Sequence, residues 1–260
     1  MFKNQRHSEI IEILRNEGFA GVRDLGERLY ASQPTIRRDL DLLEKQGYVR
    51  RSHGGAVLAD GRINTPVPFR KGTMTKEKIN ICRLAATLVQ PSQLIFADAS
   101  TTAFYLSDFL RAEDDITVVT NGMTLCRTLS ENKIRTFSTG GRLVRESEAF
   151  VGRIAESAAR EFFADLMFFS SSSLGEDGVI SDYSEEETAL RLVMREKSGQ
   201  AVFLCDSGKF SSRSAFRVFS LGEIDYFISD KPIPEELANA CGLALHCQSN
   251  GAVMYKKLVL

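Results

Sequence analysis

The sequence has few of the features that mark metal-binding or membrane-spanning proteins. Its five cysteines are an odd number, form no C-x2-C pair and lie mostly in apolar runs such as AVFLC, where cysteine is usually a small core residue. This pattern predicts a reducing, cytoplasmic setting and no zinc site. The opening MFKNQRHSEI lacks the apolar region of a signal peptide. No run approaches the roughly eighteen apolar residues of a membrane span, so we expect no membrane contact.

Catalytic and metal-binding motifs are also lacking. The histidines are only three and scattered, at His7, His53 and His246, which leaves no evident Ser-His-Asp or Cys-His arrangement. No H-E-x-x-H motif or EF-hand loop occurs. The acidic run with Asp177, Asp182 and Glu185 is more typical of helix capping, because Ser184 and Glu187 fit a capping box. We therefore expect no catalytic residues, no metal and no cofactor.

Charge of either sign is not in excess. The 260 residues carry a formal net charge of −1, which gives no global attraction to nucleic acid or to a membrane. A nucleic-acid partner would have to be bound by a local patch. The length allows one large domain or a small domain and a medium one.

The first part of the chain has the order helix, helix, helix, hairpin. Apolar residues recur at helical spacing over about 5–17, 22–30 and 33–46, and Ser32 is a natural N-cap for the third helix. YVRRSHGGAVL then alternates around a turn signal, as a short hairpin does. This order predicts an all-α winged helix-turn-helix domain over residues 1–57, with the hairpin as its wing. The Pro- and Gly-containing stretch 58–75 has little periodicity and reads as a linker.

Residues 76–260 alternate between helical and strand-like segments. EKINICRLAATLV, TAFYLSDFL and EEETALRLVMREK are expected helices. The expected strands are LIFAD, ITVVT, IRTFST, DLMFFS, AVFLC and YFISD, with LALHC as a further candidate. Short apolar strands between helices predict an α/β domain with a mostly parallel sheet covered on both faces.

The third helix and the hairpin carry residues suited to DNA. Ile36, Leu40 and Leu43 form the apolar stripe of this helix, so its N-terminal half turns other side chains away from the core. Arginine, glutamine and threonine there match the hydrogen-bonding groups of the major groove. The predicted DNA-binding residues are Ser32, Gln33, Thr35, Arg37 and Arg38 on the helix and Arg50, Arg51 and His53 on the hairpin.

Composition alone does not decide between DNA binding and a solvated charged surface. Residues 1–56 contain 10 Lys and Arg against 8 Asp and Glu, a balance of only +2. Position is more informative, because both basic pairs fall on the two elements that would meet DNA. The acidic residues lie mainly on the first helix and at the far end of the third.

The stretch SQPTIRRDLDLLEKQGYVRRSHGGA resembles the N-terminal signature of the DeoR/GlpR family of bacterial transcriptional regulators. In that family a TIRRDL helix and an R-x-HGGA wing form the DNA-binding domain. The similarity continues through VTNG, TGGRL, FVG and DSGKF and so covers nearly the whole chain. It implies a C-terminal sensor domain with a fold related to ribose-5-phosphate isomerase and, as the usual outcome, repression relieved by a phosphorylated sugar.

A second candidate site lies where predicted strands end. Loops at the carboxyl ends of parallel strands form the usual ligand crevice of such sheets, and hydroxyls and N–H groups at a helix start suit a phosphate. The predicted effector-binding residues are Asp98, Ser100, Thr101, Thr102, Asn121, Gly140, Gly141, Arg142 and Lys209. Family members usually have D-S-G-T-T where this chain has Asp98-Ala99-Ser100-Thr101-Thr102.

Three hypotheses remain for the function. The first is a transcriptional regulator, a repressor of sugar-metabolism genes that binds operator DNA and is released by a sugar phosphate. The second is a sugar-phosphate isomerase, although a fused DNA-binding domain argues against it and a shared fold does not carry an activity. The third is a DNA-binding protein whose ligand site is vestigial. Because one winged helix reads only a short half-site, we also expect a homo-oligomer assembled through the C-terminal domain.

Overall fold

The structure is a computed structural model that describes residues 3–45, 48–52, 54–58, 70 and 72–258. The chain divides into two compact units, Met1–Thr73 and Met74–Leu260, called unit 1 and unit 2 below. Each unit has its own core, as expected for a domain.

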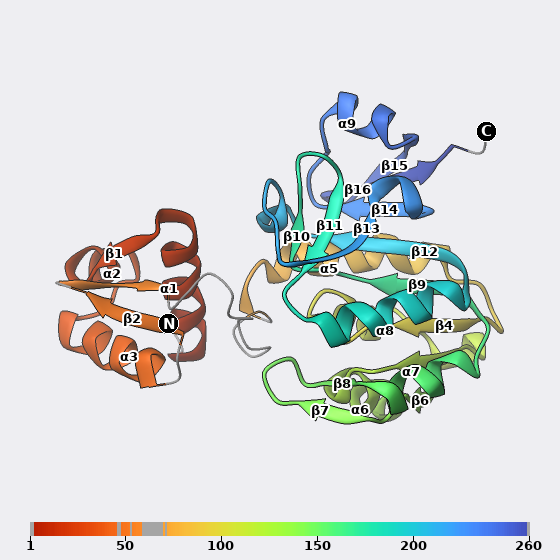
Figure 1. Ribbon diagram of the computed structural model, residues 1–260, viewed down its shortest axis with the longest axis horizontal. Helices are drawn as coiled ribbons and strands as arrows, with labels where there is room; N and C mark the ends of the chain where they lie inside the picture. Colours follow the sequence, from red (N-terminus) through yellow and green to blue (C-terminus); the bar gives the residue numbers. More distant parts are fainter. Residues whose placement is uncertain (1–2, 46–47, 53, 59–69, 71, 259–260) are drawn as a thin grey trace. The chain divides into compact units, whose positions relative to one another are not determined.

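Unit 1 has the helices and the hairpin that the sequence predicts, and one further strand. Its described helices are α1 (Lys3–Glu17), α2 (Val22–Arg28) and α3 (Gln33–Lys45). Its described strands are β1 (Phe19–Gly21), β2 (Val49–Ser52) and β3 (Gly55–Leu58), which form an antiparallel sheet in the order β1-β3-β2 (Figure 1). The wing is therefore a three-stranded sheet, because β1 pairs with β3 of the predicted hairpin.

The core of unit 1 is built from the predicted apolar stripes. The nine residues of these stripes are at most 5 % exposed: Ile10, Ile11, Leu14, Val22, Leu25, Leu29, Ile36, Leu40 and Leu43. They pack with Ala20, Val49 and Ala56 of the sheet. Helical spacing was sufficient to find them, since residues three or four apart share one face of a helix.

Unit 2 is organised around an eight-stranded sheet. Its order is β15-β16-β14-β12-β9-β4-β5-β6. The strands are β4 (Leu94–Ala97), β5 (Thr117–Thr120), β6 (Arg135–Ser138), β9 (Ala164–Phe169), β12 (Ser198–Cys205), β14 (Tyr226–Ser229), β15 (Leu243–Ser249) and β16 (Ala252–Lys257). The six strands from β14 to β6 are parallel, and β16 and β15 continue the sheet in antiparallel pairing. All the predicted strands and the mostly parallel sheet are thus confirmed.

Helices cover both faces of this sheet, which explains why its strands are apolar throughout. One apolar cluster contains residues of α7 (Arg153–Arg160), α8 (Glu185–Glu196) and α9 (Glu235–Ala240), and the other contains residues of α5 (Thr75–Ala85) and α6 (Met123–Glu131). Side chains alternate between the two clusters along each strand, as Phe203 and Leu204 of β12 do. Figure 1 shows α8 in front of the sheet and α5 behind it.

Several elements of unit 2 were not predicted. They include a sheet of β10 (Ser173–Leu174), β11 (Val179–Asp182) and β13 (Phe216–Ser220), and a hairpin of β7 (Arg142–Val144) and β8 (Ala149–Val151). The predicted helix TAFYLSDFL is the 3-10 helix η2 (Ala103–Asp108). Its bonds join residues three apart, such as Tyr105 N to Thr102 O at 3.1 Å. Short segments rich in Phe, Tyr and Thr favour the α-helix only weakly.

Candidate functional site

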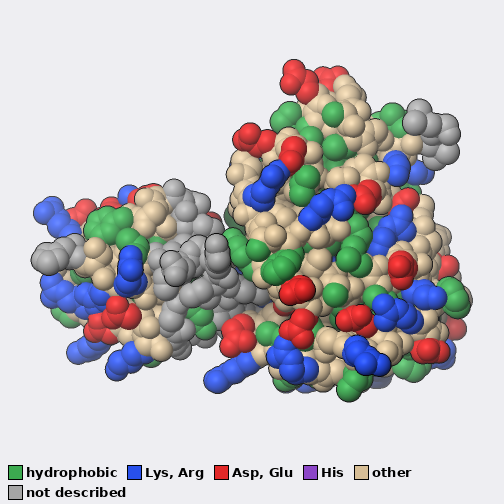
Figure 2. Space-filling view, viewed as in Figure 1, with side chains coloured by type: hydrophobic (Ala, Val, Ile, Leu, Met, Phe, Trp, Pro, Cys, Tyr) green, Lys and Arg blue, Asp and Glu red, His purple; other side chains and the backbone are tan. Residues whose placement is uncertain are grey.

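The predicted DNA-reading face of α3 is exposed and opposite the core. Gln33, Arg37 and Arg38 are exposed, whereas Ile36 and Leu40 of the same helix are fully buried. Ser32 caps the helix, because Thr35 N donates to its Oγ at 3.4 Å and the Thr35 hydroxyl lies 2.9 Å away. Figure 2 shows Lys and Arg side chains over the part of unit 1 that holds α3, with acidic side chains among them. The helix therefore presents donors at its N-terminal half.

A buried ion cluster attaches α3 to α1. Asp39, only 3 % exposed, accepts hydrogen bonds from Arg6 Nε at 2.6 Å and Arg6 Nη2 at 3.2 Å, and lies 2.8 Å from His7 Nε2. Burial alone would raise the pKa of Asp39, but the Arg6 and His7 contacts lower it overall. The adjacent Arg37 and Arg38 are thereby held on a helix that is fixed against α1.

The two wing arginines differ in their exposure and in their contacts. Arg50 is exposed, but Arg51 is half-buried and forms an ion pair with Asp41 of α3. Arg51 N also donates to Glu44 Oε1 at 2.6 Å. Arg51 thus connects the wing to α3, a contact that its sequence position did not reveal. The predicted contact at His53 lies outside the described residues.

The strand-end residues of unit 2 form a buried polar group that we call the strand-end cluster. Its members follow β4, β5, β9 and β12 and are Asp98, Ser100, Thr101, Thr102, Asn121, Ser170 and Asp206, joined by Lys78 of α5 and Lys209 of the 3-10 helix η4 (Ser207–Lys209). All but Lys209 are less than 9 % exposed. Parallel strands end at one edge of a sheet, so residues distant in sequence meet there.

Two ammonium groups meet the hydroxyls of the β4 loop. Lys209 Nζ lies 2.8 Å from Ser170 Oγ, 3.3 Å from Thr102 Oγ1 and 3.2 Å from Asp206 Oδ2. Lys78 Nζ lies 3.4 Å from Thr101 Oγ1. Burial alone would raise the pKa of Asp206, but Lys209 and Lys78 lower it overall. This arrangement of cations and hydroxyls suits an anionic group.

Asp98 has a structural role that the sequence did not suggest. Its Oδ2 accepts from Arg191 Nε at 2.8 Å and Ser170 N at 3.3 Å, and its Oδ1 accepts from Ser100 N at 3.1 Å. Arg191 also binds Asp182 at 2.9 Å and Glu187 at 3.4 Å. Burial alone would lower the pKa of Arg191, but the three carboxylates raise it overall. One buried arginine therefore contacts three carboxylates.

The acidic run was predicted to cap a helix, and part of that prediction is confirmed. Ser184 is the N-cap of α8 and accepts from Glu187 N at 3.2 Å. The Glu187 side chain, however, turns to Arg191, one helical turn further along. A glutamate and an arginine four residues apart are a common pairing on a helix, and this spacing was the available signal for Arg191.

The remaining predicted effector residues are placed by the β5 and β6 loops. Asn121 Nδ2 donates to Phe150 O at 3.1 Å, which joins the end of β5 to β8. Gly140 and Gly141 have φ values of +60° and +110°, and a Cβ on Gly141 would lie 2.6 Å from Val151 O. Arg142 is exposed and pairs with Glu186. Backbone geometry therefore explains Gly141, and Arg142 binds Glu186 of α8, which is not a member of the strand-end cluster.

The sequence interpretation missed Lys78, Ser170 and Arg191 of this region. Lys78 lies on the buried side of an amphipathic helix, and the apolar stripe gave no sign of its environment. Ser170 begins a run of four serines directly after β9, which was a usable signal for a strand-end site.

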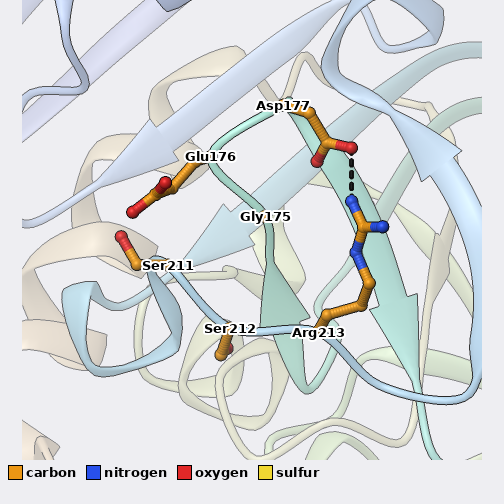
Figure 3. A pocket seen from close by; sticks show the side chains of 6 residues that line it. All are labelled: Gly175, Glu176, Asp177, Ser211, Ser212 and Arg213. Carbon is orange, nitrogen blue, oxygen red and sulfur yellow. Dashed lines mark hydrogen bonds and ion pairs between the residues drawn. The ribbon is translucent and has the colours of Figure 1, made fainter.

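A hollow lies near the strand-end cluster, where the turn after β10 faces the loop after η4. Its lining residues are Gly175, Glu176, Asp177, Ser211, Ser212 and Arg213 (Figure 3). Asp177 and Arg213 form an ion pair on one side, and Glu176 and Ser211 lie on the other. These charged side chains are exposed, so the hollow has the character of an open surface depression.

The described residues contain no group of three or more His, Cys, Asp or Glu side chains suited to a metal ion. None of their helices is long and apolar enough to cross a membrane.

The similarity of this chain to known structures is weak. The chain covers 55% of a ribose 5-phosphate isomerase from Methanocaldococcus jannaschii, about half of its length, with 53% of this chain aligned, 13% identity and a TM-score of 0.41. A Pyrococcus horikoshii translation initiation factor eIF-2B aligns over 81% of this chain and 74% of its own, with 12% identity and a TM-score of 0.42. At these TM-scores, neither similarity supports an activity.

Curated relatives are similar over almost their full length. The uncharacterized HTH-type transcriptional regulator YgbI of Escherichia coli is 34% identical, over 92% of this chain and 94% of its own. The glycerol-3-phosphate regulon repressor of Escherichia coli is 29% identical over 90% and 93%. The L-fucose operon activator of Haemophilus influenzae is 31% identical over 92% and 96%. All three names describe regulators of transcription and none describes an enzyme.

Family models match both units. Residues 6–62 match the DeoR-like helix-turn-helix domain, and residues 73–231 match the DeoR C terminal sensor domain. The first range holds the exposed face of α3 and the wing, and the second holds the strand-end cluster. The regulator hypothesis is therefore confirmed over the enzyme hypothesis, and the chain belongs to the DeoR family of DNA-binding transcriptional regulators.

Proposed function

We propose that the strand-end cluster binds a phosphorylated sugar and that this binding lowers the affinity of the α3 and wing surface for operator DNA. One observation carries the proposal: Lys209 and Lys78 lie within 3.4 Å of the hydroxyls of Thr102 and Thr101. Two ammonium groups beside a row of hydroxyls and the N–H groups of the β4 loop match the charge and the acceptors of a phosphate. The relatives that regulate a glycerol-3-phosphate regulon and an L-fucose operon support a sugar-related effector.

On DNA, the residues of α3 and of the wing have separate roles. Gln33, Arg37 and Arg38 read base edges in the major groove, because they are exposed at the N-terminal half of α3. Ser32 and Thr35 meet phosphates at the start of the helix. The wing residues Arg50, Arg51 and His53 add phosphate contacts, with Arg51 acting from its ion pair with Asp41.

The effector acts only if it binds the DNA-free arrangement more tightly than the DNA-bound one. Coupling between two sites of this kind is typically about 1–3 kcal/mol, which would change operator affinity roughly 5- to 150-fold. The test uses the full chain and an operator selected from random DNA, with binding followed by fluorescence anisotropy at fixed salt. Triose, pentose and hexose phosphates are then titrated in, each beside its dephosphorylated form.

Matched variants locate the effector site. Lys78→Met and Lys209→Met should abolish the response to the sugar phosphate and leave operator binding without effector unchanged. Lys76→Met is the control, because Lys76 lies on the same helix as Lys78 but is exposed. If every variant responds as the wild type does, the effector binds elsewhere. If no sugar phosphate changes operator binding of the wild type, the cluster is vestigial.

We also propose that the chain acts as a homo-oligomer and represses its target genes. One winged helix reads only a short half-site, so two copies are needed for useful specificity. Sedimentation of the full chain would measure its mass, and a monomer at micromolar concentration would contradict the first statement. The relatives include both a repressor and an activator. A reporter gene behind the selected operator decides between the two, since deleting the regulator raises expression only if it represses.

A further inference from the structure

The carboxylate of Asp98, one of the predicted effector-binding residues, already has hydrogen-bond partners within the protein. Both oxygens of Asp98 accept hydrogen bonds within the protein, from Ser100 N, Ser170 N and Arg191 Nε. Asp98 is also only 1 % exposed. We call the proposed phosphate-binding groups of Lys78, Lys209, Thr101 and Thr102 the phosphate cradle. A ligand hydroxyl near this cradle therefore needs an acceptor other than Asp98.

Among the described residues, three buried amide or carboxylate oxygens of this region accept no hydrogen bond: Asn121 Oδ1, Glu187 Oε1 and Asp206 Oδ2. Asp206 Oδ2 is instead in an ion pair with Lys209 at 3.2 Å. Asn121 Oδ1 and Glu187 Oε1, on residues that are 4 % and 6 % exposed, therefore remain without a partner. The orientation of the Asn121 amide is defined, because its Nδ2 donates to Phe150 O at 3.1 Å. Glu187 uses its other oxygen for Arg191, at 3.4 Å. Each residue is thus anchored through one atom and presents an unpaired oxygen.

Both acceptors flank the loop that follows β4. The guanidinium of Arg191 binds Asp98 through Nε and Glu187 through Nη2, so both carboxylates contact the same guanidinium group. On the other side, a Cβ on Gly122 would lie 3.1 Å from Cα of Ala99. Asn121, adjacent to Gly122, is therefore beside the same loop. The loop itself carries Thr101 and Thr102 of the phosphate cradle.

An unpaired buried acceptor costs free energy, and native structures contain few of them. The two unpaired oxygens beside this loop would be satisfied by hydrogen-bond donors of a ligand, because the described residues supply none. We propose that Asn121 and Glu187 form a hydroxyl-reading part of the effector site, which accepts hydrogen bonds from the hydroxyls of the ligand. This inference rests on the proposed function, and it adds to it the residues that recognise the sugar part of the ligand: hydroxyl groups close to the phosphate would donate to Asn121 Oδ1 and Glu187 Oε1.

The two parts of the site then recognise different groups of the ligand, the phosphate and the hydroxyls. The cradle of Lys78, Lys209 and the threonines recognises any phosphate monoester. The Asn121 and Glu187 oxygens reject a ligand without hydroxyls, because burial under an alkyl chain would leave them unpaired. An alkyl phosphate should therefore bind roughly 10- to 100-fold more weakly than a sugar phosphate of the same length.

The experiment compares probes on the full chain by isothermal titration calorimetry. The probes are inorganic phosphate, n-pentyl phosphate, and the ribose, glucose and glycerol phosphates. We expect the tightest of the three hydroxyl-bearing esters to bind at least 10-fold more tightly than n-pentyl phosphate. Glu187→Gln should reduce that difference and leave the affinity for inorganic phosphate within about twofold. Glu185→Gln is the matched control, since Glu185 lies on the same helix turn but is exposed.

The ratio of two affinities separates recognition from general damage. A variant that is merely less stable would bind inorganic phosphate and the sugar phosphate more weakly by the same factor. This outcome would overturn the inference. So would equal binding of pentyl phosphate and the sugar phosphates by the wild type. If Glu187→Gln does not fold, Asn121→Ala provides the same ratio. Binding of none of the phosphates, by contrast, would overturn the proposed function itself, and this inference with it.

Discussion

At the scale of single residues, each unit depends on a buried cluster of polar side chains that contains an ion pair. Asp39 joins Arg6 and His7 in unit 1, and Arg191 joins three carboxylates in unit 2. Buried ion pairs add little net stability when they are complete, but removal of one member leaves a charge without a partner in a poorly solvated place. These residues therefore hold elements in position and are sensitive to substitution.

Asp39→Ala should lower the free energy of unfolding of unit 1 by about 3–5 kcal/mol, because Arg6 loses its buried partner. Urea denaturation followed by circular dichroism measures this change. Asp41→Ala is the control, since Asp41 pairs with Arg51 at an exposed site and such pairs contribute at most about 1 kcal/mol. Equal effects of the two substitutions would show that the Asp39 cluster does not hold α1 against α3.

The lowered pKa of Asp39 gives a dependence on pH with a defined sign. The unfolded chain protonates this carboxyl near its ordinary value of about 3.9, whereas the folded chain does so only at lower pH. Its contribution to stability is therefore complete above the ordinary pKa and is lost as the pH falls through the folded pKa. The difference in unfolding free energy between wild type and Asp39→Asn should shrink from pH 5 to pH 3. A difference that stays constant over this range would contradict the assignment.

At the scale of elements, α3 and the wing act as one surface. Asp39 fixes α3 to α1, and Arg51 with Glu44 and Asp41 connects the wing to α3. β1 pairs with β3 on the other side of the wing. These three links define the positions of the exposed side chains of Arg37, Arg38 and Arg50, which we propose contact DNA.

Arg37→Ala and Arg38→Ala should each cost about 1–3 kcal/mol of operator binding and relax specificity at one base pair. Arg50→Ala should weaken all sequences alike and reduce the salt dependence, as a phosphate contact does. Anisotropy with operator and scrambled DNA at several salt concentrations separates the two kinds of contact. Arg127→Ala, an exposed arginine of α6, is the control for a simple loss of charge. Wild-type binding by both α3 variants would show that the helix does not read the groove.

Gly55 in the wing should tolerate no side chain. A Cβ there would lie 2.1 Å from Ala20 O and 2.8 Å from Cζ of Phe19, because β3 passes close to β1. Gly55→Ala should therefore destabilise unit 1 by about 1–3 kcal/mol and weaken operator binding. Gly54 has a φ of +75° but open space around it, so Gly54→Ala should cost only the strain of that backbone conformation, about 1 kcal/mol. Thermal melting of the two variants measures both losses of stability, one caused by a steric clash at position 55 and one by a strained backbone at position 54.

At the scale of the whole molecule, a DNA-reading unit and a ligand-sensing unit share one chain, as the family models of the two units indicate. Two carboxylates that an isomerase could use as an acid or base are held in ion pairs. Asp98 is engaged with Arg191, and Asp206 is engaged with Lys209.

We therefore expect no conversion of aldose to ketose phosphates by the pure protein. Following pentose and hexose phosphates by NMR over hours would detect slow turnover. A ribose 5-phosphate isomerase in the same buffer is the positive control. Sustained turnover that Lys209→Met or Asp98→Asn abolishes would place this chain with enzymes despite its DNA-binding unit.

Much of the fold could be predicted from the sequence because its signals are local. The stripes of α1, α2 and α3 and the apolar runs of the sheet depend on periodicity within one segment. The strand-end position of Asp98, Asn121 and Asp206 followed from the same reasoning, since polar residues came directly after buried strands. Short elements such as β10, β13 and the β7–β8 hairpin were missed because so few residues show little periodicity, and β13 also depends on pairing with β11, which is remote in sequence.

The sequence by itself determined the type of each unit: three amphipathic helices with a basic hairpin, and a parallel sheet with hydroxyls and a lysine at its ends. Only the tertiary structure decided which charges are free to act. Arg191 comes from 93 residues beyond Asp98, and its ion pair turns a predicted ligand acceptor into a structural anchor. The same contacts leave oxygens of Asn121 and Glu187 unpaired. The physical reason is that a side chain's role depends on the partners that folding brings within hydrogen-bond distance, and those partners are remote in sequence.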